Sequence, residues 1–214
     1  PPIDFIPELE QNGLICFVDF FVLETVCEYI HNWQKHGKKF IKVSVNMSRT
    51  TLRKKNVVQK AVAICSKYQI EPQMIEIEIT ESIGGLEKKL IARLMDDFHA
   101  AGFSIALDDF GSGFSNIAAL AENDFDVVKF DKSLIDTIFE NDKSRTVIQQ
   151  AINLCNAVNK NIETVGEGVE TEQQLQILKE YGCDIGQGYL FSRPIPEEKF
   201  LKYFLTGENG EKCD

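Results

Sequence analysis

The stretch LEKKLIARLMDDFHAAGFSIALDD, residues 86–109, holds one complete helix-to-strand unit. Apolar side chains recur in it at the spacing of a single helix face: Leu90, Leu94 and Phe98. This spacing predicts a helix over Leu86–Ala101, and Gly102 follows where a left-handed cap is expected. The short apolar run Ser104–Leu107 then predicts a buried strand. The strand stops at two adjacent acids, Asp108 and Asp109, which its packing does not require.

The same alternation of short apolar runs and helical stretches continues on both sides of this unit. We expect six strands: Phe40–Val45, Ile75–Ile79, Ser104–Leu107, Val127–Phe130, Ile162–Val165 and Asp184–Ile185. Strands that alternate with helices predict an α/β fold with a parallel sheet. Because a closed barrel of this kind has eight strands and about 250 residues, one interpretation is a TIM-like barrel whose N-terminal strands are missing from this sequence. An open sheet with a site at a topological switch point is the alternative.

A helix precedes the first expected strand, and its apolar spacing suggests which side is buried. One side carries Phe21, Val22, Thr25, Val26, Tyr29 and Trp33, and Gly37 is placed to end the helix. We expect this side to face the core.

Composition limits the class of protein. At 214 residues and 43% hydrophobic content the chain can bury one core, so we expect one domain over residues 1–206 and a polar tail over 207–214. Every apolar stretch is broken before the roughly 20 residues of a membrane span, and the six cysteines are too dispersed for a zinc site. The lack of such a span and the interpretation of the cysteines as reduced thiols favour a cytoplasmic protein, with membrane attachment through upstream segments as the alternative for the full-length protein. The net charge of −10 argues against a broad nucleic-acid surface, and an anionic ligand would need bound cations.

Polar side chains end nearly every expected strand: Asn46, Glu78, Asp108, Asp109, Lys129, Glu167 and Gln187. In a barrel of strand-helix units the carboxyl ends of the strands converge on one face, so these side chains could meet. Amide and carboxylate oxygens are hard ligands suited to Mg²⁺ or Mn²⁺. Two adjacent acids could also serve two ions that hold a phosphate. This placement favours the barrel over the open sheet.

Each of these residues also has a purely structural interpretation. Asn46, followed by Ser48, could cap a helix, and Glu78 could face solvent or a helix on strand periodicity alone. Asp108 and Asp109 could form a turn, Lys129 could form a surface ion pair with Asp131, and Glu167 and Gln187 could belong to loops. Capping alone, however, hardly explains six strand ends that all carry metal-binding or phosphate-binding groups.

Hydrolysis by a histidine or a serine is disfavoured. The histidines, His31, His36 and His99, lie in expected helices or at their ends, and none lies at a strand end. No G-x-S-x-G sequence occurs, and Gly111-Ser112-Gly113 is better explained as a loop.

Six motifs follow in order along the chain: SVNMS (44–48), EITES (78–82), LDDFGSGFSN (107–116), KFD (129–131), GEGVET (166–171) and GQGYLFSRP (186–194). Together with FIPELEQNG near the start, they resemble the ordered motifs of EAL domains over nearly the whole chain. The resemblance implies a barrel that binds bis-(3′,5′)-cyclic dimeric GMP, or cyclic-di-GMP. It also implies hydrolysis of one phosphodiester to linear pGpG, in bacterial signalling, with Mg²⁺ or Mn²⁺ as two bound ions.

The resemblance also implies a set of metal ligands. Asn46, Glu78 and Asp108 would hold one ion, and Asp108 with Asp109 would help to hold the second. Glu167 would support the second ion or its water.

The remaining roles that the resemblance implies concern substrate and assembly. Lys129 would lie beside the nucleophilic water and the phosphate, and Gln187 would orient water or substrate. Glu81 would brace the loop Phe110–Ser115, which in the family couples the metal site to dimerisation, so a homodimer is expected.

One residue of the family pattern has no counterpart here. In the family, the glutamate of the E-A-L motif lies on the strand before the segment that here begins PPIDFIPELE, and Glu8 and Glu10 match a helix start instead. We expect the natural protein to continue upstream, with a GGDEF or sensory domain, because a barrel without two strands would expose sheet edges. The alternative is a shortened domain that is a non-hydrolysing cyclic-di-GMP sensor or a dimerisation module.

Overall fold

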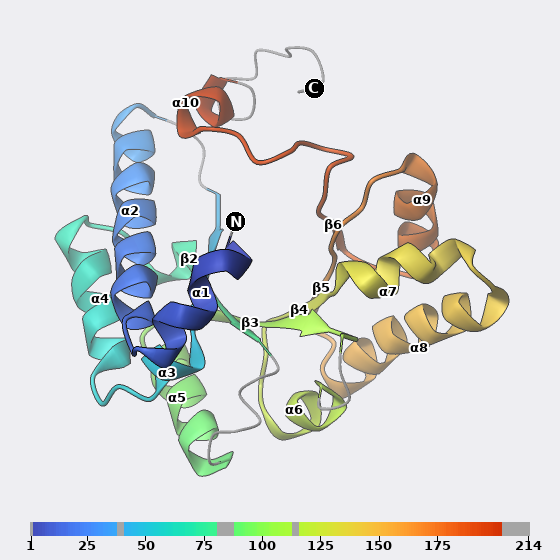
Figure 1. Cartoon of the computed structure of the whole chain (residues 1–214), viewed down its shortest axis with the longest axis horizontal. Coiled ribbons are helices and arrows are strands. Elements are labelled where there is room, and N and C mark those ends of the chain that lie inside the picture. Colours follow the sequence, from blue (N-terminus) through green and yellow to red (C-terminus); the bar gives the residue numbers. More distant parts are fainter. Residues whose placement is uncertain (1, 38–40, 81–87, 113–115, 203–214) are drawn as a thin grey trace. The chain divides into compact units, whose positions relative to one another are not determined.

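The expected alternation of strands and helices is confirmed by a computed structural model, which describes residues 2–37, 41–80, 88–112 and 116–202. Six strands form one sheet in the chain order β1-β2-β3-β4-β5-β6 (Figure 1). The pairs β1–β2, β4–β5 and β5–β6 are parallel. By its contacts the chain divides into two compact units, residues 1–106 with 122–124 and residues 107–121 with 125–214. The single domain over residues 1–206 stays a prediction.

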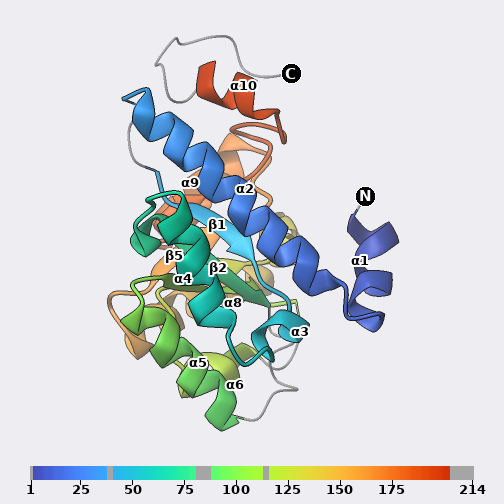
Figure 2. The same cartoon turned by 90° about the vertical axis from the view of Figure 1, so that its left-hand side faces the viewer.

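The first unit contains the amino-terminal helices and the first strands. Its elements are α1 (Pro2–Gln11), α2 (Ile15–Lys35), β1 (Val43–Asn46), α3 (Arg49–Leu52), α4 (Val57–Lys67), a 3₁₀ turn (Pro72–Met74), β2 (Ile75–Thr80) and α5 (Lys88–Ala100). Helices α2 and α4 lie side by side, and α2 packs against β1 (Figure 2). Strand β2 is buried on both faces, as parallel strands usually are, with isoleucines on one face and Glu76 and Glu78 on the other.

The buried side of α2 differs from the expected one. Its buried side chains are Ile15, Asp19, Phe20, Leu23, Cys27, Ile30 and Trp33. Of the side predicted to face the core, Trp33 is buried, but Phe21, Val22 and Tyr29 are exposed, so that prediction is wrong. Apolar residues lie nearly all round this helix, and more than one side therefore has the spacing of a buried face. Packing against β1 and α4 selects the side that contains Asp19.

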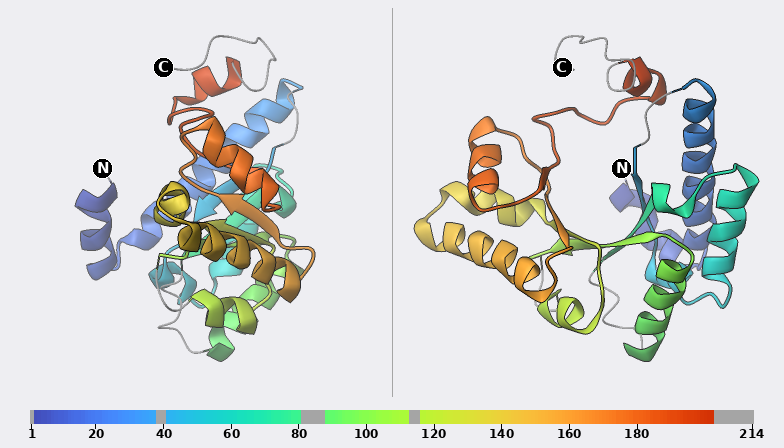
Figure 3. Two further views of the ribbon diagram at one scale, coloured as in Figure 1. Left: turned by 90° about the vertical axis from the view of Figure 1, so that its right-hand side faces the viewer. Right: turned by 180° about the vertical axis from the view of Figure 1, so that it is seen from behind.

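The second unit contains most of the remaining elements. These are the end of β3 (Ser104–Phe110), α6 (Asn116–Glu122), β4 (Val127–Phe130), α7 (Lys132–Asp136), a 3₁₀ turn (Thr137–Phe139), α8 (Asp142–Val158), β5 (Glu163–Gly166), α9 (Glu172–Glu180), β6 (Ile185–Gly186) and α10 (Glu197–Phe200). Figure 3 shows α8 and α9 on the same side of β4, β5 and β6. All four residues of β4 are buried, including Lys129.

Two glycines allow β5 and β6 to approach α9 closely. A Cβ atom on Gly166 would lie 2.7 Å from Cδ1 of Leu178, and one on Gly186 would lie 2.8 Å from Cδ1 of Leu175. The leucines of α9 therefore fill the volume that side chains on the strands would need. This packing fixes the strand ends just before Glu167 and Gln187.

The helices and the cysteines of the structure bear on two features of the composition. None of the helices in the described part of the chain combines the length and the apolar content that crossing a membrane requires. The described cysteines, Cys16, Cys27, Cys65, Cys155 and Cys183, are free thiols. Burial raises the pKa of Cys155 to about 12, so this thiol stays protonated at neutral pH.

Candidate functional site

Asn46 and Glu78 meet where β1 and β2 end. The two residues are partners in the parallel register, and Nδ2 of Asn46 donates to Oε2 of Glu78 over 2.9 Å. Glu78 is only 6% exposed, which excludes the solvent-facing orientation that strand periodicity allows. Because the amide nitrogen of Asn46 is turned to the carboxylate, its carbonyl oxygen is left to accept from or bind another group.

A further acid, which the sequence analysis missed, contacts the segment after Asn46. Asp19 on α2 is buried, and its Oδ2 accepts hydrogen bonds from Ser48 and Thr51. Ser48, and not Asn46, is the residue that caps the next helix, since its side chain accepts from Thr51 N. The signal for Asp19 is a single acid inside the apolar run GLICFVDFFVL, because a carboxylate within a packed helix needs hydrogen-bond partners.

Asp108 and Asp109 lie near the end of β3 and are partly exposed. Asp109 has a φ of 58°, in the left-handed region, and its N–H donates to Oδ1 of Asp108 over 2.9 Å. Ser112 donates to the carbonyl oxygen of Asp109 from both its N–H and its hydroxyl, over 3.1 and 2.9 Å. The turn interpretation is therefore correct for the backbone here, and it leaves a role for the carboxylates open.

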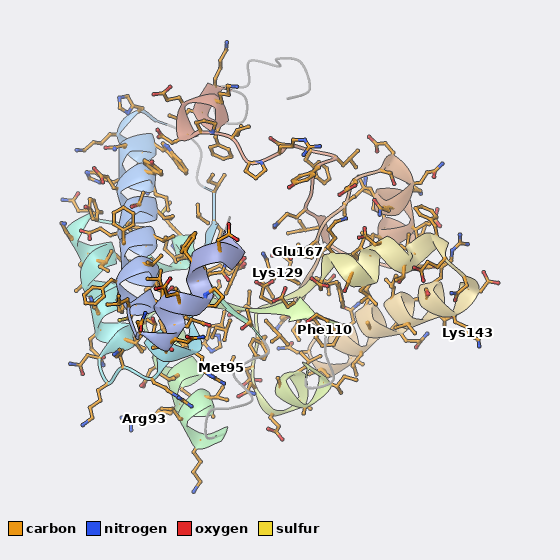
Figure 4. The ribbon with its side chains drawn as sticks, in the orientation of Figure 1. Arg93, Met95, Phe110, Lys129, Lys143 and Glu167 are labelled. Atoms are coloured by element: carbon orange, nitrogen blue, oxygen red, sulfur yellow. The ribbon has the colours of Figure 1, made fainter. Side chains whose placement is uncertain are left out.

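Lys129, Glu167 and Gln187 form a connected group in the second unit, and Figure 4 labels the first two. Nζ of Lys129 donates to Oε1 of Glu167 over 2.8 Å, and Nε2 of Gln187 donates to the same oxygen over 3.3 Å. The side chains of Lys129 and Glu167 are 5% and 20% exposed. A lysine this buried needs a countercharge, and Glu167 supplies it. The interpretation of Lys129 as part of a surface ion pair is therefore excluded.

Backbone hydrogen bonds continue one residue beyond the ends of β5 and β6, to Glu167 and Gln187. Phe130, Gly166 and Gly186 are aligned across β4, β5 and β6. The N–H of Glu167 donates to Phe130 O over 3.0 Å, and that of Gln187 donates to Gly166 O over 2.9 Å. The ladder thus continues to Glu167, which accepts from Lys129, and to Gln187, which donates to Glu167, so both side chains start from fixed positions.

The donor atoms at these strand ends are of the chemical type that binds divalent cations. Asn46, Glu78, Asp108 and Asp109 offer amide and carboxylate oxygens, which Mg²⁺ and Mn²⁺ prefer. No group of three or more His, Cys, Asp or Glu side chains that could hold a metal gathers among the residues that the structure describes. Glu81 and residues 113–115 of the loop Phe110–Ser115 lie outside those residues. The prediction of these metal ligands therefore depends on their oxygen donor atoms and on the positions of the residues at strand ends.

Comparison with known proteins identifies the family to which this chain is similar. A model of the EAL domain family matches residues 1–194. The signalling protein YkoW of Bacillus subtilis is 32% identical over 205 residues, which cover 96% of this chain and 25% of YkoW. The probable cyclic di-GMP phosphodiesterase PdeB of Escherichia coli is 31% identical over 203 residues, which cover 94% of this chain and 38% of PdeB. The chain thus spans well under half the length of these relatives.

A solved structure also resembles this chain over most of its length. The PaMucR phosphodiesterase in complex with c-di-GMP matches it with a TM-score of 0.86 and 28% identity, covering 94% of this chain and 80% of that chain. The match confirms the TIM-like (β/α) barrel class of the EAL type and excludes the open doubly wound sheet.

Proposed function

The chain belongs to the EAL domain family, and from this we propose that it hydrolyses cyclic-di-GMP to linear pGpG with two divalent ions, Mg²⁺ or Mn²⁺. The names of PdeB and PaMucR support this substrate and reaction. The observation that carries the proposal is the pairing of buried Glu78 with Asn46 at the ends of adjacent strands. Glu76, the other buried acid of β2, accepts from Ser44, whereas Glu78 lies nearer the carboxyl end of the strand, the end at which strands of a βα barrel carry their sites.

The proposed ligands divide between the two ions. Asn46, Glu78 and Asp108 hold one ion, and Asp108 with Asp109 helps to hold the other. When bound, such ions lower the pKa of a coordinated water and neutralise charge on the attacked phosphate. The side chains named here need only hold their oxygens in place, and no side chain of the protein has to act as the nucleophile.

Lys129 acts on the phosphate and on the attacking water in this proposal. An ammonium fixed at a strand end stabilises negative charge that develops on phosphate oxygens. The hydrogen bond that Lys129 donates to Glu167 sets the direction of the ammonium. Gln187 donates to the same oxygen of Glu167, and in this proposal it orients water or substrate.

Glu167 has a second oxygen for the role that the family pattern suggests. Its Oε1 accepts from both Lys129 and Gln187, whereas Oε2 has no hydrogen bond to a described residue. We assign Oε2 to the second ion or to its water, and Oε1 to the positioning of Lys129.

Assembly and context belong to the same proposal. We infer a cytoplasmic homodimer in which Glu81 braces the loop Phe110–Ser115. We also infer that a GGDEF or sensory domain lies upstream in the full-length protein, because the chain covers only a part of its relatives.

The direct test is to incubate the full-length protein with cyclic-di-GMP and Mn²⁺ and to separate the products by chromatography. We expect one pGpG for each cyclic-di-GMP consumed, and no product when the metal is chelated. A folded protein that forms no pGpG would contradict the proposal. Calorimetry then separates the alternatives, because a sensor binds the nucleotide and releases it unchanged, and a dimerisation module does not bind it.

A further inference from the structure

Asp19 connects α2 to the segment that follows Asn46. Three donors converge on its Oδ2: Ser48 N at 2.9 Å, Ser48 Oγ at 2.7 Å and Thr51 Oγ1 at 2.6 Å. Asp19 is 6% exposed and Thr51 is fully buried. Hydrogen bonds to a carboxylate are stronger than those between neutral groups, particularly away from water. One side chain of α2 therefore ties down two residues of this segment.

The segment depends on this tie for its shape. Helix α3 has only four residues, Arg49–Leu52, and a helix so short is not stable by itself. The hydroxyl of Ser48 donates to Asp19 and accepts from Thr51 N over 3.2 Å. Asp19 thus sets the direction of the hydroxyl that caps α3.

Asn46 lies immediately before the tied segment. The N–H of Met47 donates to Glu78 O over 3.0 Å, so β2 holds the chain on one side of Ser48 and α2 holds it at Ser48 itself. The side chain of Asn46 is exposed, and Glu78 is its hydrogen-bond partner among the described residues. The direction of its amide oxygen therefore follows from where the backbone is held.

We infer that Asp19 is a positioning residue for Asn46, an inference that rests on the proposed function. Through Ser48 and Thr51 it keeps the backbone of Asn46 in the place from which the amide oxygen reaches the ion beside Glu78. Asp19 itself does not touch the ion. The competing interpretation is a tie that stabilises the fold and nothing more.

Asp184 provides a matched control for that interpretation. Its Oδ2 accepts from Thr164 N and Thr164 Oγ1 over 2.8 and 2.7 Å. Thr164 is the second residue of β5, whereas Glu167 follows the last. Asp184 is thus a carboxylate tie with the same kinds of donor, more exposed than Asp19, at the amino-terminal end of a strand and away from the proposed site.

The experiment measures Mn²⁺ binding directly, by calorimetry on the full-length protein without nucleotide, together with the unfolding temperature. We expect Asp19→Ala to weaken Mn²⁺ binding by roughly 10-fold or more. Asp19→Asn, which keeps one acceptor oxygen, should recover part of this loss. Asp184→Ala should lower the unfolding temperature but leave Mn²⁺ affinity within about twofold of the unaltered protein.

Three results would overturn the inference, and they can be told apart. If the unaltered protein binds Mn²⁺ and Asp19→Ala binds it equally well, Asp19 is only a structural tie and the proposed function stands. If the unaltered protein neither binds Mn²⁺ nor hydrolyses cyclic-di-GMP, the proposed function falls and the inference falls with it. Should Asp19→Ala fail to fold, Thr51→Val decides, because it removes one of the three donors; unchanged Mn²⁺ affinity in that variant would also overturn the inference.

Discussion

The two units each place a glutamate at the end of a strand, but they give it different partners. Glu78 in the first unit accepts from the neutral amide of Asn46, and Glu167 in the second accepts from the ammonium of Lys129. Of these two hydrogen bonds, that to Glu78 comes from a neutral group, and that to Glu167 comes from an ammonium, which also balances its charge. The comparison teaches that similar strand-end acids can have different tasks. We expect Glu78 to bind a metal cation and Glu167 mainly to hold the ammonium of Lys129.

The largest effect should come from removing the charge of Glu78. Glu78→Gln keeps the size of the side chain but weakens the ion site, and we expect pGpG formation to fall by about 1,000-fold, the value of several kcal/mol of charge stabilisation. Glu76→Gln is the matched control, because Glu76 is also buried on β2 and accepts from Ser44 over 2.8 Å. Equal losses in the two variants would show that burial alone, and not metal binding, sets the effect.

The next effect concerns the cation of the second unit. Lys129→Met should lower turnover by roughly 100-fold, since it removes a donor to the phosphate. It also leaves Glu167 without its countercharge, so the free energy of unfolding in urea should fall by about 3 kcal/mol. Adding Glu167→Gln should restore most of the stability and none of the turnover. Recovery of both would mean that Lys129 is needed only to neutralise Glu167.

A smaller effect is expected at Gln187, which makes a single 3.3 Å hydrogen bond to Glu167. Gln187→Ala should reduce turnover by up to about 10-fold, the value of one hydrogen bond, with an unchanged unfolding temperature. Gln176→Ala is the control, because Gln176 is exposed on α9 and donates to Glu180 over 3.0 Å. A loss in the control as large as in Gln187→Ala would remove Gln187 from the site.

The smallest effect should come from Lys132, whose Nζ lies 2.8 Å from Asp136 and 3.0 Å from Glu170. Its side chain is 47% exposed, so Lys132→Met should cost at most about 1 kcal/mol of stability and leave turnover within twofold. The hydrogen bond that Lys132 donates to Asp136, and then that to Glu170, raises the pKa of Lys132 above its ordinary value of 10.5. Its contribution is therefore present below that value and is lost as the pH rises through the raised pKa. Unfolding curves recorded from neutral to alkaline pH would check this, and a difference that instead vanishes below pH 7 would contradict it.

Much of the fold follows from local sequence, because short apolar runs and helical spacing are local properties. The strands at Ile75–Thr80 and Val127–Phe130 lie where the pattern predicts them, and the polar residues at their ends are visible in sequence. The buried side of α2 was predicted wrongly, since apolar residues on both sides of the helix satisfy the same spacing. Contact with β1, α3 and α4 distinguishes the sides.

The partners within the site are less accessible to sequence reasoning. Lys129 and Glu167 are separated by 38 positions, and their pairing depends on β4 and β5 being neighbours in register. Asp19 was missed for a related reason, because its donors lie 29 and 32 positions away, across a helix-to-strand contact. Residue type shows which side chains can do chemistry, whereas tertiary packing decides which of them share a hydrogen bond.

The close contact of Gly166 with Leu178 has a consequence for transplanting this site into another protein. Leu178 occupies the volume above β5, and Leu175 does the same above β6, so neither strand has a complete surface of its own. A graft of the strand ends alone would leave two cavities and two unsupported loops. The smallest exchangeable module that carries Glu167 and Gln187 therefore runs from β5 through α9 to β6. A host that requires a bulkier residue at the position of Gly166 would leave no room for the side chain of Leu178.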